Sequence, residues 1–143
     1  GVDRILVVGG DGMVFEVLQG LSSRADADVA LRVPLGVVPA GSGNGLAASL
    51  MHHSDEQYAT RNAAFAAVKG TPKPLDLAES FQGGTSRLLS FLTLTYGFIS
   101  DLDIKTEPMR WMGDTRFTLG ALFFAAKKRA YPARLHLLEV APA

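Results

Sequence analysis

Short, unbroken apolar runs alternate with segments of helical spacing in the first half of the chain. The run at 5–8 is rich in β-branched residues, and apolar residues then recur every three or four positions at 13–21. A second run at 35–38 is followed by a helix-like segment at 46–50. Runs without alternation are typical of parallel strands buried on both faces. This order of strands and helices predicts an α/β fold with a parallel sheet.

A further helix is expected before the middle of the chain. Ser54 and Gln57 match a capping box, in which the first residue is the N-cap and the fourth returns a hydrogen bond. The alanine-rich segment behind them predicts a helix as far as Lys69, which Gly70 ends.

The pattern changes after a proline-containing linker at 71–74. Apolar runs at 75–77 and 88–96 flank a turn at 82–85, which indicates the start of a second, strand-rich domain. A last helix is expected from 115 to about 130, with Asp114 as its N-cap.

Composition excludes several classes of function. The chain has 143 residues, with 14 basic and 14 acidic side chains, so its formal net charge is zero. This balance argues against a nucleic-acid-binding protein, which needs a basic surface. The absence of cysteine excludes disulfides, thiolate metal sites and a cysteine nucleophile. No apolar run approaches the roughly 20 residues that span a bilayer.

Two glycine-rich segments, 9–12 and 39–45, each follow a predicted strand and precede a predicted helix. Ligands of open α/β sheets bind at this end of the strands, where glycines let backbone N–H groups approach a phosphate. The second segment lacks the dinucleotide fingerprint, because Leu46 stands at the last glycine position, and no P-loop sequence is present. Either segment alone could simply be a tight turn. Together they favour phosphate binding.

Asp11 lies between two glycines at the end of the first predicted strand. From that position a carboxylate could hold Mg²⁺ or accept a proton from a substrate hydroxyl. Aspartate is also a preferred N-cap residue, and the local sequence leaves both roles open.

These motifs resemble the catalytic domain of the diacylglycerol kinase superfamily of lipid kinases. The resemblance is carried by Gly9-Gly10-Asp11-Gly12 with Glu16, by Pro39 to Asn44 with Leu46-Ala47, and by Asp76. Later residues resemble the sphingosine kinase branch in particular: the run from Tyr96 to Asp103, then Glu107, Arg110, Met112-Gly113, Arg116-Phe117 and Leu119-Gly120. Together these motifs cover nearly the whole chain.

The resemblance implies a role for each matching position. Asp11 would be the base that activates the lipid hydroxyl, and it is the candidate ligand for the Mg²⁺ that accompanies ATP. Asp103 would recognise the polar head of the lipid, with Thr93 near the same group. The implied nucleotide-binding residues are Gly10, Gly12, Glu16, Gly41, Ser42, Gly43, Asn44, Arg110 and Arg116.

The resemblance also implies a domain organisation. Residues 1–71 would form the nucleotide-binding α/β part, and residues 72–143 the beginning of the strand-rich lipid-binding domain. The family's first strand and helix would precede Gly1, so the nucleotide-binding domain is expected to be truncated at its N-terminus. The chain alone is therefore expected not to phosphorylate lipid. Substitutions relative to the family pattern are small: Gly9 for Ser, Tyr96 for Trp and Thr106 for Ser.

The expected function is transfer of the γ-phosphate of ATP to the primary hydroxyl of a sphingoid base. The resemblance implies a cytoplasmic protein that associates peripherally with membranes and does not bind nucleic acid; it gives no oligomeric state. The alternatives are a diacylglycerol or ceramide kinase, a soluble NAD kinase, and a non-catalytic nucleotide-binding fragment. Asp103 separates the lipid kinases, because a sphingoid base presents an ammonium group that diacylglycerol and ceramide lack.

Overall fold

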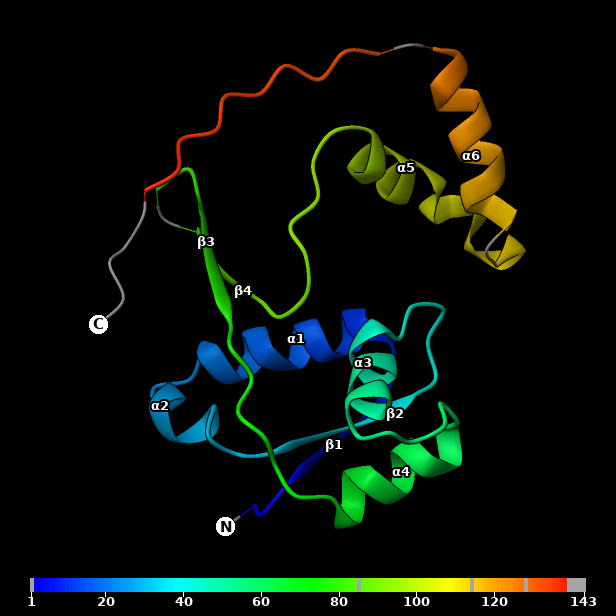
Figure 1. Ribbon diagram of the computed structural model, residues 1–143. Helices are drawn as coiled ribbons and strands as arrows, with labels where there is room; N and C mark the ends of the chain where they lie inside the picture. The colour runs from blue at the N-terminus through cyan, green and yellow to red at the C-terminus, as the bar shows by residue number, and fades with distance from the viewer. Residues whose placement is uncertain (1, 85, 114, 128, 139–143) are drawn as a thin grey trace. The chain divides into compact units, whose positions relative to one another are not determined.

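The computed structural model describes residues 2–84, 86–113, 115–127 and 129–138, without the side chains of Gln82, Ser86 and Arg110. The chain divides into two compact units, Gly1–Leu94 and Thr95–Ala143. Each unit is described by itself (Figure 1).

The first unit is built on a two-stranded parallel sheet. Strand β1 (Ile5–Gly9) pairs with β2 (Leu35–Pro39), with Ile5 opposite Leu35 and Gly9 opposite Pro39. The helices around this sheet are α1 (Asp11–Ser22), the short α2 (Ala27–Ala30), α3 (Gly45–His53) and α4 (Thr60–Lys69). The predicted α/β fold with a parallel sheet is confirmed. Because both strands end at the same edge, the two glycine-rich segments meet there.

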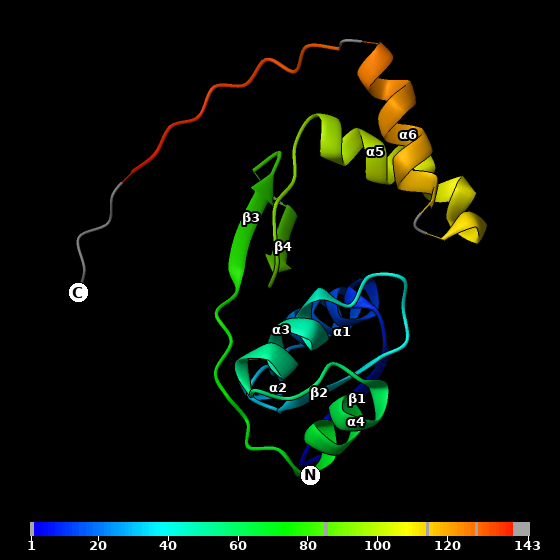
Figure 2. The same ribbon diagram turned by 45° about the vertical axis from the view of Figure 1, so that its right-hand side comes forward.

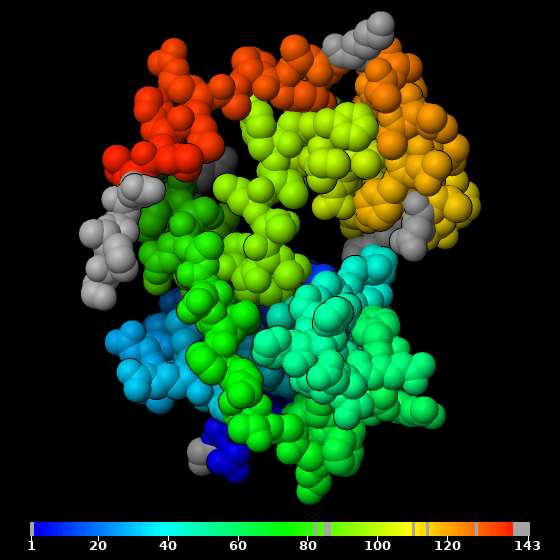
Figure 3. Space-filling model, viewed as in Figure 1, coloured from blue at the N-terminus to red at the C-terminus, as the bar shows by residue number. Residues whose placement is uncertain are grey.

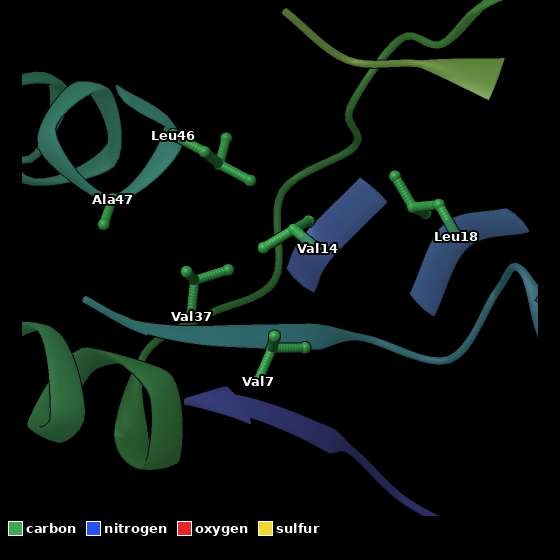
Figure 4. Close-up of a cluster of buried hydrophobic side chains, with 6 residues drawn as sticks. All are labelled: Val7, Val14, Leu18, Val37, Leu46 and Ala47. Atoms are coloured by element: carbon green, nitrogen blue, oxygen red, sulfur yellow. The ribbon is translucent and has the colours of Figure 1, made fainter. Parts of the chain in front are cut away.

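The core lies between the sheet and two helices. Val7 and Val37 point from the strands towards Val14 and Leu18 of α1 and towards Leu46 and Ala47 of α3 (Figure 4). Helices α1 and α3 cover this face, and α4 lies against the other (Figures 1 and 2). Side chains on α1 and α3 therefore anchor the helices that follow the two glycine-rich segments.

Helix α4 packs against β2 and leaves much of β1 open. A Cβ on Gly36 would lie 2.8 Å from both the Cβ and the carbonyl oxygen of Ala67, so glycine lets α4 approach this strand. On β1, Leu6 and Val8 remain 49% and 64% exposed. The expectation that the first strand is buried on both faces is wrong for the described residues, because α4 covers its neighbour instead.

The predicted capping box is also wrong. Ser54 is the C-cap of α3, and α4 begins only at Thr60, with Ala59 as its N-cap. Asp55 adopts a left-handed φ of 54°, which no α-helix accommodates. Gly70 does end α4 as predicted, in an extended rather than a left-handed conformation.

Strands β3 (Ala78–Gln82) and β4 (Ser86–Ser90) form an antiparallel hairpin. The predicted strand at 75–77 is wrong, and the one at 88–96 ends at Ser90 instead. Residues 71–77 have no regular structure and run along the outside of the first unit (Figure 3). The hairpin packs against α1 and so belongs to the first compact unit. The domain boundary between 71 and 72 stays a prediction.

The second unit is helical where the structure describes it. It contains α5 (Phe98–Thr106), the 3₁₀ helix η1 (Glu107–Met112) and α6 (Thr115–Ala126). Helix α6 begins as predicted and ends about one turn early; its predicted cap, Asp114, lies outside the described residues. The described part of 95–138 has no strand, so a strand-rich second domain is not confirmed. None of the described helices is long and apolar enough to cross a membrane.

Candidate functional site

The two glycine-rich segments touch backbone to backbone. The N–H of Ala40 donates to the Gly9 carbonyl at 3.1 Å, and the N–H of Asp11 donates to the Gly43 carbonyl at 3.0 Å. A Cβ on Gly10 would lie 2.5 Å from the Gly43 oxygen, and one on Gly41 would lie 2.4 Å from the Gly10 Cα. Neither position has room for a methyl group. Gly10 and Gly41 are therefore required by the contact between the segments.

Gly12 and Gly43 differ from this pair, because a Cβ at either position would meet no clash. A Cβ on Gly12 would meet nothing within 4 Å, and one on Gly43 would make an ordinary 3.7 Å contact with Asp11 Oδ2. Both residues are exposed. The fold itself does not require glycine at either position, whereas a ligand that approaches the backbone closely would. The sequence alone could not separate these two kinds of glycine.

The Asp11 carboxylate caps a helix other than its own. Its Oδ2 accepts a hydrogen bond from the N–H of Gly45 at 2.7 Å, and its Oδ1 accepts one from the N–H of Leu46 at 3.1 Å. These N–H groups open α3, whose positive dipole end favours the negative charge. The capping role that the sequence left open is therefore real, although the capped helix is α3. Each carboxylate oxygen keeps a second lone pair for a proton or a cation.

The N-terminus of α1 lacks such a side-chain cap. Its N-cap residue is Gly10, which has no side chain to accept a hydrogen bond from the first turn. Of its first-turn N–H groups, those of Asp11 and Met13 already donate to the carbonyls of Gly43 and Gly10. The exposed Gly12, in contrast, presents its N–H at the positive end of the helix dipole. A backbone N–H in this position is suited to binding an anion such as phosphate.

The remaining sequence-predicted residues of the first unit are Asn44, Ser42, Glu16 and Thr93. Asn44 closes its own loop: its Oδ1 accepts from the Gly41 N–H at 3.0 Å, and its Nδ2 donates to the Gly41 carbonyl at 2.6 Å. Ser42 is exposed in that loop, and Glu16 is exposed on α1. Thr93 is exposed in the irregular segment after β4. The geometry thus brings Asp11 together with Gly10, Gly12, Gly41 and Gly43.

In the second unit, Arg116 is held between two carboxylates. Its Nη1 donates to Glu107 Oε2 at 2.9 Å, and its Nη2 lies 3.7 Å from Asp103 Oδ1. Arg116 is only 5% exposed, whereas the Asp103 side chain is 68% exposed. Asp103 can therefore meet a cation from solvent while Arg116 stays fixed. Arg110 lies in η1, and its side chain is outside the part of the chain that the structure describes.

Asp101 is an ion-pair centre to which the sequence assigned no function. Its Oδ2 accepts hydrogen bonds from Lys105 Nζ at 2.6 Å, Tyr131 Oη at 2.7 Å and Arg129 Nη1 at 3.1 Å. The bonds from Lys105 and then Tyr131 lower the pKa of the Asp101 carboxyl, and the same carboxylate raises the pKa of Tyr131. Lys105, four residues along the helix, was the available sequence signal; Arg129 and Tyr131 gave none.

Metal ligands are sparse in the described residues. They contain no group of three or more histidine, aspartate or glutamate side chains that could hold a metal ion. A dedicated protein cage for a metal is therefore not formed by this part of the chain. A cation delivered with phosphate needs fewer protein ligands, because the phosphate oxygens supply the others.

Comparisons with known proteins agree on one family. Residues 1–80 match the model of the diacylglycerol kinase catalytic domain. Human sphingosine kinase 2 is 39% identical over 141 residues, which cover 95% of this chain and 22% of that protein. Human sphingosine kinase 1 is 38% identical over 96% of this chain and 37% of its own length. Sphingoid long chain base kinase 4 of Schizosaccharomyces pombe is 41% identical over 82% of this chain and 25% of its own length. The chain therefore spans well under half the length of these relatives.

Proposed function

We propose, from the premise that this chain belongs to the diacylglycerol kinase catalytic domain family, that it is part of an ATP-dependent lipid kinase acting on sphingoid bases. The relatives named sphingosine kinase or sphingoid long chain base kinase support the choice of substrate. The γ-phosphate of ATP would be transferred to the primary hydroxyl of the base. Because its substrate is a lipid, the complete protein would act at a membrane surface.

The observation that carries this proposal is the surface around Asp11. Gly12 and Gly43 are exposed and could carry a Cβ without a clash, and α1, which has no side-chain cap, begins at Asp11 itself. Two requirements of phosphoryl transfer thus coincide: the backbone N–H of Gly12, which can approach a phosphate, and a carboxylate in the neighbouring residue.

The Asp11 carboxylate is a suitable protein ligand for magnesium-bound ATP. Magnesium commonly uses one or two carboxylates together with phosphate oxygens and water, so Asp11 alone suffices as a protein ligand. Bound Mg²⁺ would offset charge on the phosphates. Gly12, Gly43 and the neighbouring backbone would hold the nucleotide, with Glu16 and Ser42 at its edge.

The chain's own side chains would supply the remaining chemistry. The free lone pairs of the Asp11 carboxylate would accept the proton of the lipid hydroxyl as its oxygen bonds to the γ-phosphorus and the bond from that phosphorus to the departing ADP breaks. Arg110 and Arg116 would stabilise phosphate charge, because a planar guanidinium offers paired donors. Arg116 can do so only with N–H groups that its bond to Glu107 leaves free, or after that bond breaks.

Substrate choice would rest on Asp103. Its carboxylate is largely exposed and can pair with the ammonium group of a sphingoid base. Neither diacylglycerol nor ceramide presents a cation for this pairing. Thr93, exposed after β4, would contact the same polar head group.

The proposal is tested by assaying the complete gene product with γ-labelled ATP and three lipids: a sphingoid base, diacylglycerol and ceramide. We expect labelled product with the sphingoid base and far less with the other two. Preferred labelling of diacylglycerol or ceramide would contradict the substrate assignment. ATP binding without labelling of any lipid would indicate a non-catalytic nucleotide-binding protein instead.

A further inference from the structure

The Gln19 side chain on α1 binds the backbone of Leu89 as a neighbouring strand would. Its Nε2 donates to the Leu89 carbonyl at 2.8 Å, and the Leu89 N–H donates to its Oε1 at 3.0 Å. The Nε2 group also donates to the Phe15 carbonyl at 3.2 Å. Donor and acceptor of the amide are thus both engaged, by a residue 70 positions away along the chain.

This pair of hydrogen bonds fixes the outer edge of β4. In an antiparallel pair the N–H and C=O of one residue point to the same side, and those of Leu89 point towards Gln19 rather than towards β3. A two-stranded hairpin is marginally stable by itself and needs packing against another element. Leu89 is 3% exposed, so the hairpin is anchored to α1 by burial and by the Gln19–Leu89 hydrogen bonds together.

The segment that leaves β4 leads to the Asp11 surface. Phe91 packs against the core of the first unit. The two methyl carbons of Leu92 would lie 3.8 and 3.9 Å from a Cβ on Gly45, whose N–H donates to Asp11. Thr93 follows directly. The anchored residue Leu89 is therefore four positions from the proposed head-group contact.

We propose that Gln19 is a positioning residue for the lipid substrate. By holding β4 to α1, the helix that begins with Asp11, it sets where residues 91–93 run beside the Asp11 surface. This inference rests on the proposed function, in which the lipid hydroxyl is phosphorylated next to Asp11. Gln19 would act through backbone position alone and would not contact the nucleotide.

The test compares Gln19→Met with the parent in the complete gene product. Methionine keeps the side-chain length and removes both hydrogen bonds to Leu89. The two bonds together contribute about 1–3 kcal/mol to holding β4 in place, so the KM for the sphingoid base should rise several-fold, up to a limit of roughly 150-fold. The KM for ATP should stay within about twofold, because the contacts among the glycine segments are untouched. Amide hydrogen exchange should become faster across residues 89–94.

Two further variants separate positioning from general destabilisation. Gln19→Glu keeps an acceptor for the Leu89 N–H but turns a carboxylate oxygen towards the carbonyls of Leu89 and Phe15, so its lipid KM should rise at least as far as that of Gln19→Met. Arg4→Met is the matched control, because Arg4 also donates two side-chain hydrogen bonds to backbone, to Ala67 at 2.6 Å and Gly70 at 3.1 Å. Arg4 lies just before the first residue of β1, whereas Asp11 comes after the last residue of that strand. Arg4 is therefore at the opposite end of β1 from Asp11. Its loss should lower the thermal midpoint and leave the ratio of the two KM values unchanged.

Folded Gln19→Met with unchanged lipid KM and unchanged exchange at 89–94 would overturn the inference. Equal rises in both KM values would do the same, because they would indicate a general loss of structure. A parent protein that phosphorylates no lipid would contradict the proposed function and, with it, the positioning role. The exchange measurement would still decide whether Gln19 holds β4.

Discussion

Asp11 combines, at the scale of one residue, an observed structural role with the chemical role that we propose for it. Its two oxygens close the N-terminus of α3 through Gly45 and Leu46, and this fixes the carboxylate between the two glycine segments. Each of its oxygens keeps a second lone pair beyond these hydrogen bonds. A base held in this way needs no reorganisation before it accepts a proton, which is the usual advantage of a preorganised site.

We predict that Asp11→Asn weakens the fold and nearly abolishes turnover. Asparagine keeps one acceptor oxygen but turns an NH₂ group towards one of the two α3 N–H groups, so the free energy of unfolding should fall by about 1–3 kcal/mol. Loss of a general base should lower kcat by roughly 10²- to 10⁴-fold. Thermal unfolding and steady-state kinetics measure the two effects separately. A folded variant with near-normal kcat would show that Asp11 is structural only.

The residues found from sequence share a feature that the missed ones lack. Asp11, Gly12 and Gly43 lie in short local motifs at strand ends, where the chemistry can be inferred from neighbours in the chain. Gln19 and Asp101 act through partners that the fold brings from 70 and 30 positions away. A single sequence carries no signal for such pairs, so only the structure identifies them.

At the scale of elements, the glycine segments combine two requirements in one motif. Gly10 and Gly41 permit the contact between the segments, whereas Gly12 and Gly43 leave a surface open. The four positions look equivalent in the sequence. The space available for a methyl group distinguishes them. Alanine substitutions can therefore test the effect on the fold and the effect on ligand binding separately.

Gly41→Ala and Gly12→Ala should therefore have opposite effects. Alanine at 41 must displace the Gly10 backbone, and overpacking of this kind costs about 1–3 kcal/mol of stability. Alanine at 12, inside α1, should leave stability unchanged or raise it by up to about 1 kcal/mol. If phosphate binds the backbone there, the same variant should raise the KM for ATP by roughly 10- to 100-fold, the equivalent of one charged hydrogen bond. A stable Gly12→Ala variant with parental KM for ATP would place the nucleotide elsewhere.

Elements that depend on long-range packing were predicted less well than those set by local pattern. Strands β1 and β2 and helix α1 follow from apolar runs that end at glycine. The capping box at Ser54 failed because α3 extends through His53 and uses Ser54 as its C-cap. The hairpin turns within the predicted 82–85 segment, at Gly83 and Gly84. Its first strand lies three residues further along the chain than predicted and its second spans Ser86–Ser90, because register depends on cross-strand pairing rather than on alternation along the chain.

At the scale of the molecule, family membership and geometry support different parts of the account. The match to the diacylglycerol kinase catalytic domain covers residues 1–80 and includes the Asp11 surface. Asp103 and Arg116 lie in the second unit, where the similarity to sphingosine kinases continues. The proposed substrate choice therefore rests on residues beyond the family match, and a direct measurement on Asp103 tests it.

That measurement is kcat/KM of Asp103→Ala on a sphingoid base and on an analogue of the same chain length with a hydroxyl in place of the amine. A hydrogen bond to a charged group is worth about 1.5–3 kcal/mol, so activity on the base should fall roughly 10- to 100-fold while activity on the analogue changes little. Glu107→Gln is the control, because it weakens the other ion pair of Arg116 and should affect both lipids equally. An equal loss on the two lipids in Asp103→Ala would contradict recognition of the amine and remove the chemical basis for a sphingoid-base kinase.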